Sequence, residues 1–180
     1  MTASIKLRVC VLTIVILLTI PVSARGQLAL WLVEKRLDLK YDVPDVTYVE
    51  LKKRLSSEGA SKYMIFDTRQ KEEYETSHIQ SAIYIAPDMS ADAFMKQYGS
   101  RIRGKHLVFY CSVGDRSSHF IERVREKALE KGAMSLSNLR GGIFRWYNEK
   151  NTVVNENGET DAVHPYDEEW GKLIIKREGR

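Results

Sequence analysis

The sequence predicts an α/β fold in which a parallel sheet of about five strands is covered by helices on both faces. Short apolar runs bounded by polar residues recur along the chain, and each is too short for a helix, so these runs are expected to be buried strands. Segments with helical periodicity or helix-capping signals separate them. Ligands of such sheets bind beyond the carboxyl ends of the strands, where a functional site is therefore expected.

The first half of this predicted domain begins with a helix. Thr47 and Glu50 form a capping box, in which each residue satisfies a backbone N–H near the helix start. The elements predicted after it are, in order, a strand at 63–66 that ends at Asp67, a helix at 70–75, a strand at 83–85 and a helix capped by Ser90.

The second half begins with the central strand, at 107–110, which consists of four apolar residues. A loop and an amphipathic helix follow, and Gly132 stops that helix. The remaining predicted elements are a strand at 134–139, a Gly-Gly turn at 141–142 and a short helix at 144–147.

Residues 25–46 form a lead-in to this domain. Leu28, Trp31, Leu32 and Lys35 recur there at helical spacing. This pattern predicts a short helix that covers the edge of the domain.

Residues 150–180 form a C-terminal extension. Its first part, 150–164, is polar and contains an Asn-Gly turn signal, so it is expected to be an exposed loop or a hairpin. Apolar residues between 165 and 175 are expected to pack back on the domain.

The N-terminus has the features of a secretory signal peptide. Lys6 and Arg8 precede an apolar run, Val9–Ile20, and small residues then lead to a predicted cleavage point after Ala24. Spanning a bilayer takes about 20 apolar residues, so no stable membrane anchor is expected, and an uncleaved anchor is the minority alternative. The protein is therefore predicted to lose residues 1–24 and to be periplasmic or secreted.

The net charge and the number of cysteines exclude some classes of function. Cleavage would remove two cations and no anions, which lowers the net charge from +4 to +2. Such a balanced charge argues against a nucleic-acid partner. Cleavage would also remove Cys10, and Cys111 alone cannot form an internal disulfide. A lone thiol in an oxidising compartment indicates a chemical role for that cysteine.

Cys111 ends the central strand and stands just before the helix. Gly114 allows the intervening loop to turn left-handed, and the backbone N–H groups of a loop and helix N-terminus converge on an anion. This setting favours the thiolate, which is the nucleophilic form. Arg116 adds a fixed cation, and Ser117 and Ser118 are expected to cap the helix. The loop therefore predicts a reactive cysteine.

The cysteine loop, Cys-x-x-Gly-x-Arg-Ser after an apolar strand, resembles the active-site loop of the rhodanese (sulfurtransferase) domain. Two further groups of residues agree with that family in order and spacing: 65–69 with Glu73-Tyr74 and His78-Ile79, and 139–142 with Trp146. The resemblance implies the rhodanese-like three-layer fold of the single-domain type, with the domain at 47–149.

The resemblance also implies an activity. The protein would move a sulfane sulfur from a donor, such as thiosulfate or a persulfide, to a thiol or cyanide through a persulfide on Cys111. The implied substrate-binding residues are Ser112, Val113, Gly114, Asp115, Arg116 and Ser117. Asp67 and Arg69 are expected to form a structural ion pair, although Asp67 could instead orient Arg116. No cofactor is implied, and the histidines lack metal-ligand spacing, so no metal is predicted.

Two other functions remain open. A cysteine phosphatase or arsenate reductase has a related loop, typically with five residues between cysteine and arginine, whereas this chain has four. The smaller ring suits a sulfur atom better. A non-catalytic rhodanese-like module would dock an exported partner or carry persulfide to it, and the C-terminal extension would be the natural docking segment. The negative charge of Asp115 predicts weak attraction for dianionic thiosulfate.

Overall fold

The computed structural model describes residues 22–177. The predicted signal peptide lies outside this range except for its last three residues, which begin the first described helix, α2 (Val22–Lys40). Within the described range, no helix has both the length and the apolar character needed to cross a membrane.

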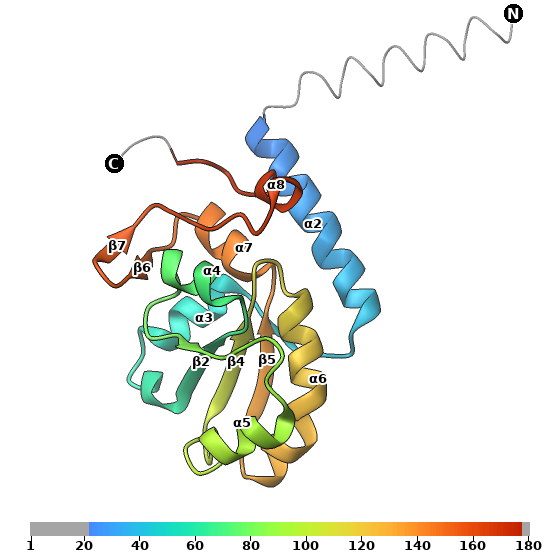
Figure 1. The fold of residues 1–180 in the computed structure, drawn as a ribbon, viewed down its shortest axis with the longest axis vertical. Helices are drawn as coiled ribbons and strands as arrows, with labels where there is room; N and C mark the ends of the chain where they lie inside the picture. The colour runs from blue at the N-terminus through green and yellow to red at the C-terminus, as the bar shows by residue number, and fades with distance from the viewer. Residues whose placement is uncertain (1–21, 178–180) are drawn as a thin grey trace, which may run out of the picture.

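A five-stranded parallel sheet with helices around it forms the centre of the molecule, which confirms the predicted α/β fold (Figure 1). Its strand order is β1-β5-β4-β2-β3. The strands are β1 (Asp45–Val46), β2 (Tyr63–Asp67), β3 (Ile83–Tyr84), β4 (His106–Tyr110) and β5 (Ser135–Leu139). The main helices are α3 (Tyr48–Leu55), α4 (Lys71–Thr76), α5 (Ala91–Tyr98), α6 (Asp115–Glu130) and α7 (Gly142–Asn148), with a 3-10 turn, η1, at Ala60–Lys62.

Both faces of the central strand β4 are buried, because its side chains alternate between two cores. Phe109 packs with Phe94 of α5 and Phe120 of α6 in one core. Tyr110 belongs to the other core, which includes Leu51 of α3 and residues of α7. This two-sided burial explains why β4 reads as a continuous apolar run rather than as an alternating one.

Local sequence signals define several helix starts. The capping box at the start of α3 is present, with Glu50 N–H donating to Thr47 Oγ1 and Thr47 N–H donating to Glu50 Oε2. Ser90 Oγ accepts the Ala93 N–H at the start of α5. These predicted caps are confirmed. They could be predicted because each depends only on residues three positions apart.

The helix predicted in the lead-in exists as α2, but the apolar stripe that predicted it is not the face that packs. Leu28, Trp31 and Leu32 are 49%, 47% and 56% exposed. Leu30 is fully buried instead, and Glu34 of α2 pairs with Arg145 of α7 at 2.8 Å. The helix therefore packs through a neighbouring face that combines apolar and charged side chains.

The C-terminal extension forms a hairpin and then returns to the domain. The hairpin consists of β6 (Val153–Asn155) and β7 (Gly158–Thr160), and a short helix, α8 (Glu168–Gly171), follows. Leu173 joins the same core as Tyr110. Figure 1 shows α8 beside α2, and a Cβ placed on Gly26 of α2 would lie 3.2 Å from the Lys172 carbonyl oxygen.

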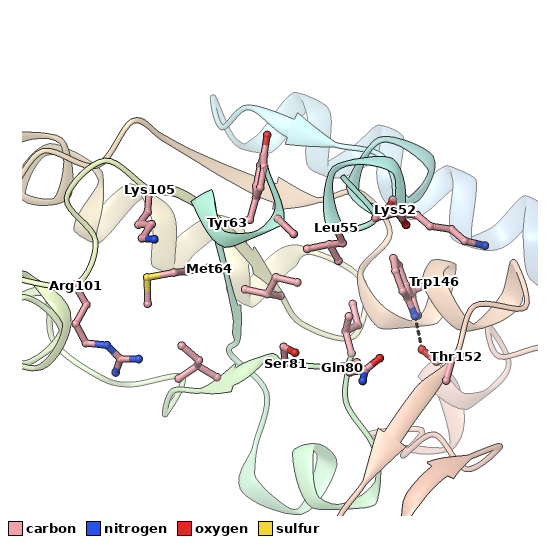
Figure 2. Close-up of a pocket in the computed structure, with 15 residues that line it drawn as sticks. Lys52, Leu55, Tyr63, Met64, Gln80, Ser81, Arg101, Lys105, Trp146 and Thr152 are labelled. Carbon is pink, nitrogen blue, oxygen red and sulfur yellow. Dashed lines mark hydrogen bonds between the residues drawn. The ribbon is translucent and has the colours of Figure 1, made fainter. Parts of the chain in front are cut away.

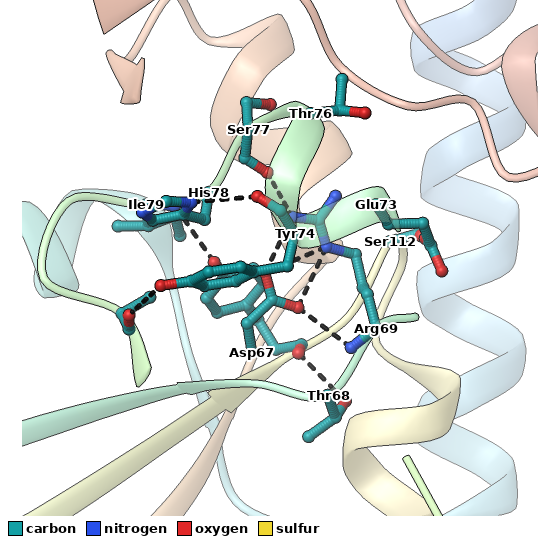
Figure 3. A network of polar contacts seen from close by, with 12 residues as sticks. Asp67, Thr68, Arg69, Glu73, Tyr74, Thr76, Ser77, His78, Ile79 and Ser112 are labelled. Carbon is teal, nitrogen blue, oxygen red and sulfur yellow. Dashed lines mark hydrogen bonds and ion pairs between the residues drawn. The ribbon is translucent and has the colours of Figure 1, made fainter. Parts of the chain in front are cut away.

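Asp67 and Arg69 form a buried ion pair at the carboxyl end of β2 (Figure 3). Both side chains are fully buried, and Arg69 Nη2 donates to Asp67 Oδ2 at 2.7 Å. Arg69 Nη2 also donates to the Ser77 carbonyl oxygen, which ties the strand end to the segment after α4. The alternative partner for Asp67 is wrong: Arg116 pairs with Glu73, not with Asp67.

Replacing Asp67 by Ala should lower the free energy of unfolding by about 3–5 kcal/mol, because Arg69 would remain charged and buried without its partner. Denaturant unfolding measures this loss. The matched control is Asp92→Ala, since Asp92 pairs with Lys127 at the surface and its side chain is 85% exposed. The control should lose less than about 1 kcal/mol. Equal losses in both variants would contradict the structural role of the buried pair.

Candidate active site

Cys111 lies directly beyond the carboxyl end of β4 and just before α6. It is 1% exposed, and the Gly114 N–H donates to its Sγ at 3.2 Å. Gly114 is the N-cap residue of α6, with φ at +113°, a left-handed conformation that glycine adopts without strain. The thiol thus lies against the first turn of a 16-residue helix.

The serines predicted to cap this helix do not do so. Gly114 occupies the N-cap position and no side chain caps the helix. Ser117 Oγ instead donates to Asn138 Oδ1 of β5 at 2.7 Å, and both Ser117 and Ser118 are buried within α6. The first backbone N–H groups of a helix have no intrahelical acceptor, so without a side-chain cap they can bind an anion at Cys111.

The start of α7 hydrogen-bonds to the backbone of the cysteine loop. Ile143 N–H donates to the Cys111 carbonyl oxygen at 2.9 Å, and Phe144 N–H donates to the Ser112 carbonyl oxygen at 3.0 Å. A Cβ on Gly142 would lie only 2.3 Å from the Cys111 carbonyl oxygen, and φ there is +57°. Only glycine fits at this position, so the second residue of the Gly-Gly turn allows α7 to fix the loop backbone.

Glu73 of α4 is the main partner of Arg116. Arg116 Nη1 donates to Glu73 Oε2 at 2.7 Å, and Arg116 Nη2 donates to Glu73 Oε1 at 2.9 Å. Ser112 Oγ donates to Glu73 Oε1 at 2.8 Å and accepts from Arg116 Nη2 at 2.9 Å. Three side chains from two segments of the chain therefore form one hydrogen-bonded group beside the thiol.

The electrostatics of this group favour its charged state. Burial by itself would raise the pKa of Glu73, but the hydrogen bonds and charge of Arg116, together with hydrogen bonds from the Gln70 N–H and Ser112, outweigh burial and lower that pKa below its ordinary value. Burial would lower the pKa of Arg116, but hydrogen bonding to Glu73 and the proximity of Cys111 raise it further above neutrality. Both side chains are therefore charged at neutral pH.

Asp115, the acidic residue of the loop, is paired with the end of α2 and the residue after it. Its Oδ1 accepts from Lys40 Nζ at 2.8 Å and from Tyr41 OH at 2.9 Å. Burial would raise the pKa of Asp115, but these two hydrogen bonds lower it overall. The two charged residues of the loop thus each meet an opposite charge, Asp115 on Lys40 and Arg116 on Glu73.

A cavity of about 170 Å³ adjoins the thiol. Its lining combines the cysteine loop with two aromatic residues of the C-terminal extension: Cys111, Ser112, Val113, Asp115, Arg116, Tyr166 and Trp170. A larger hollow of about 660 Å³ lies elsewhere, lined partly by Lys52, Arg101 and Lys105 (Figure 2). Neither Cys111 nor Arg116 lines that hollow, so the smaller cavity is the candidate active site.

The structure brings five of the predicted site residues to this cavity, namely Cys111, Ser112, Val113, Asp115 and Arg116. Gly114 contacts the thiol through its N–H, whereas Ser117 points to β5 and Asp67 and Arg69 form their own pair. The sequence analysis missed Glu73, Lys40, Tyr166 and Trp170 as neighbours of the site. Only Glu73 carried a signal, as an acidic residue within the first turn of a helix that follows a strand end.

Fold and site together define an α/β protein with a cysteine on an uncapped helix N-terminus beyond the central strand. Residues 47–149 match the family model of the rhodanese-like domain, and the chain belongs to that family. This match confirms the resemblance stated from the sequence motifs.

Other known proteins are similar over parts of the chain. A probable molybdopterin-synthase adenylyltransferase from Porphyra purpurea is 30% identical over 110 residues, which are 60% of this chain and 26% of that protein. The chain thus spans about a quarter of the length of that relative.

Solved structures share the fold at low sequence identity. The thiosulfate sulfurtransferase from Pseudomonas aeruginosa has a TM-score of 0.52 at 19% identity and covers 85% of this chain and 26% of its own. The As-Sb reductase from Leishmania major has a TM-score of 0.54 at 18% identity and covers 61% of this chain and 79% of its own. At these identities the likeness concerns the fold alone.

Proposed function

We propose that the protein is an exported sulfurtransferase that moves a sulfane sulfur from a small donor to a thiol or cyanide through a persulfide on Cys111. The observation that carries this proposal is the hydrogen bond from Gly114 N–H to Cys111 Sγ at an uncapped helix N-terminus. That environment stabilises negative charge on a sulfur atom, whether it belongs to the thiolate or to the terminal atom of the persulfide.

The reaction proceeds in two half-reactions. In the first, the Cys111 thiolate attacks the outer sulfur of the donor, the sulfur–sulfur bond of the donor breaks, and its electron pair leaves with the remainder, which is sulfite when the donor is thiosulfate. In the second, the acceptor attacks the terminal sulfur, and the electron pair of the broken bond returns to Cys111 as thiolate. One covalent intermediate shared by two substrates predicts ping-pong kinetics.

The charge pairing at the loop bears on the choice of donor. Glu73 neutralises Arg116 and Lys40 neutralises Asp115, so the cavity offers no strong net positive charge from its own loop. A dianion such as thiosulfate gains little from such a site, whereas a singly charged persulfide loses less on leaving water. We therefore propose small, singly charged persulfides as better donors than thiosulfate.

Mass spectrometry of the purified protein tests this function. After exposure to a sulfane donor, the peptide that contains Cys111 should gain the mass of one sulfur atom, and cyanide should remove it with formation of thiocyanate. A phosphate-ester substrate should not be hydrolysed. Phosphatase activity without any sulfur gain would replace this proposal by the phosphatase alternative. Sulfur gain without turnover would favour the persulfide-carrier alternative.

The same measurement tests the proposed export. Protein recovered from the cell envelope or the medium should begin at Arg25. An intact N-terminus on membrane-bound protein would instead support the uncleaved anchor.

A further inference from the structure

Tyr166 and Trp170 form an aromatic wall over the cysteine, and both lie outside the matched rhodanese-like region at 47–149. They come from the C-terminal extension, on either side of the start of α8. The wall and the cysteine loop line the same cavity of about 170 Å³. The extension thus supplies one side of the candidate active site.

Tyr166 is half exposed, and two observations describe its position at the cavity. The Arg116 guanidinium lies over its ring, 4.9 Å from the ring centroid, which is a cation–π contact. Its φ is +69°, in the left-handed region, which is strained for a bulky aromatic residue. A strained conformation of this kind persists only where the surroundings fix it, and such residues concentrate at ligand sites.

The segment that carries the wall is fastened to the domain. Asn148 at the end of α7 donates through Nδ2 to the Leu173 carbonyl oxygen at 2.8 Å and accepts at Oδ1 from Ile175 N–H at 2.9 Å. Arg177 Nη2 donates to the carbonyl oxygens of Tyr147 and Asn151. These contacts fasten the segment directly after the wall, residues 173–177, to the end of α7 and the residues that follow it.

The cavity behind the wall is small. A volume of 170 Å³ corresponds to roughly six water molecules at about 30 Å³ each. Cys111 at its base is 1% exposed. Thiosulfate and cyanide fit within this volume, whereas a peptide thiol must carry its flanking residues past Tyr166 and Trp170 to bring its sulfur to Cys111.

We propose that Tyr166 and Trp170 act as a size filter that admits small sulfur compounds to Cys111 and disfavours peptide thiols and persulfides such as those of glutathione. The proposal rests on the proposed sulfur transfer for its biological meaning. The steric claim itself concerns only access to the thiol. It assigns the C-terminal extension a role in substrate specificity.

Competing thiol-labelling rates test the filter without any sulfur transfer. The protein is residues 25–180, which lack the predicted signal peptide. It is treated with a small reagent, iodoacetamide, and separately with a bulky one, a fluorescein maleimide. The labelling rate with each reagent is then compared among variants. Tyr166→Ala should raise the rate of bulky labelling relative to small labelling by about tenfold. Tyr166→Phe keeps the ring and should leave the ratio within about twofold of the parent.

Trp31→Ala is the matched control, because Trp31 is an exposed aromatic of α2 and does not line the cavity. Its ratio should not change. An unchanged ratio in Tyr166→Ala overturns the filter, and so does an equal rise of both rates, which would mean general access rather than selection by size. If Tyr166→Ala fails to fold by circular dichroism, Trp170→Ala with the same two reagents decides.

A parallel activity measurement separates the filter from the proposed function. In Tyr166→Ala, kcat/KM with glutathione as acceptor should rise relative to kcat/KM with cyanide. If labelling changes as expected but no variant transfers sulfur, the filter stands and the proposed function fails. If sulfur is transferred but neither ratio changes, the proposed function stands and the filter fails.

Discussion

Cys111→Ser should reduce sulfur transfer by at least about a thousandfold, because a serine hydroxyl is not ionised at neutral pH and cannot form a persulfide. The fold should be retained. The serine Oγ can accept the Gly114 N–H that now bonds to Sγ, and the backbone contact from Ile143 to the residue 111 carbonyl oxygen does not involve the side chain. Stability should therefore change by no more than about 1 kcal/mol.

Two measurements on the Cys111→Ser protein check this result. Thiocyanate formation from a sulfane donor and cyanide gives the activity, and denaturant unfolding gives the stability. Retention of more than about a tenth of the activity would show that sulfur does not pass through this residue. Loss of activity together with unfolding would leave the chemistry undecided on this variant alone, so Cys111→Ala provides a second test of the same role.

Glu73→Gln should lower both stability and activity at neutral pH. The Glu73 side chain is 1% exposed and neutralises Arg116, whose side chain is 25% exposed, so glutamine would leave that partly buried cation without its counter-charge. We expect a loss of about 2 kcal/mol in the free energy of unfolding, below the range for fully buried pairs because solvent reaches Arg116. The activity should fall because glutamine keeps only one acceptor oxygen, so the second hydrogen bond from Arg116 and the charge that orients its guanidinium are lost.

The stability difference between the parent and Glu73→Gln should depend on pH in a defined direction. The pKa of Glu73 is lower in the folded protein than its ordinary value of 4.5. Its charged form therefore contributes stability above pH 4.5, and this contribution is lost as the pH falls through the lowered folded-state pKa. Unfolding measured between neutral pH and about pH 3 should show the two proteins converge at the acid end.

Glu75→Gln is the matched control for Glu73→Gln. Glu75 lies in the same helix, α4, and pairs with Lys71 across the surface, with both side chains more than half exposed. This variant should lose less than about 1 kcal/mol at any pH. A Glu73→Gln stability difference that stayed constant down to pH 3 would mean that its cause is packing rather than charge.

The sheet and most helices could be predicted because their signals are local. The capping box at Thr47 and Glu50 involves residues three positions apart, and the apolar run of β4 reflects burial on both faces of the sheet. The position of Cys111 at the carboxyl end of β4 followed from the same strand prediction. The topology of parallel sheets then placed that cysteine at the edge where ligands bind.

The partners of the loop could not be predicted, because they come from distant parts of the chain. Glu73 is 43 residues from Arg116, and Lys40 is 75 residues from Asp115. No periodicity relates such positions, so their pairing depends on how the helices pack on the sheet. The face by which α2 packs was missed for a similar reason. Its contact with Arg145 is made by a charged residue, Glu34, and not by an apolar one.

Asp115 pairs with Lys40, so the rhodanese-like region at 47–149 does not contain the counter-charge of Asp115. A fragment cut to those boundaries would keep Cys111 and Arg116 but leave an uncompensated carboxylate beside the thiol. It would also lack Tyr166 and thereby open the cavity on its aromatic side. The two flanking segments are therefore parts of the candidate active site, and comparisons with isolated domains of this family need to include them.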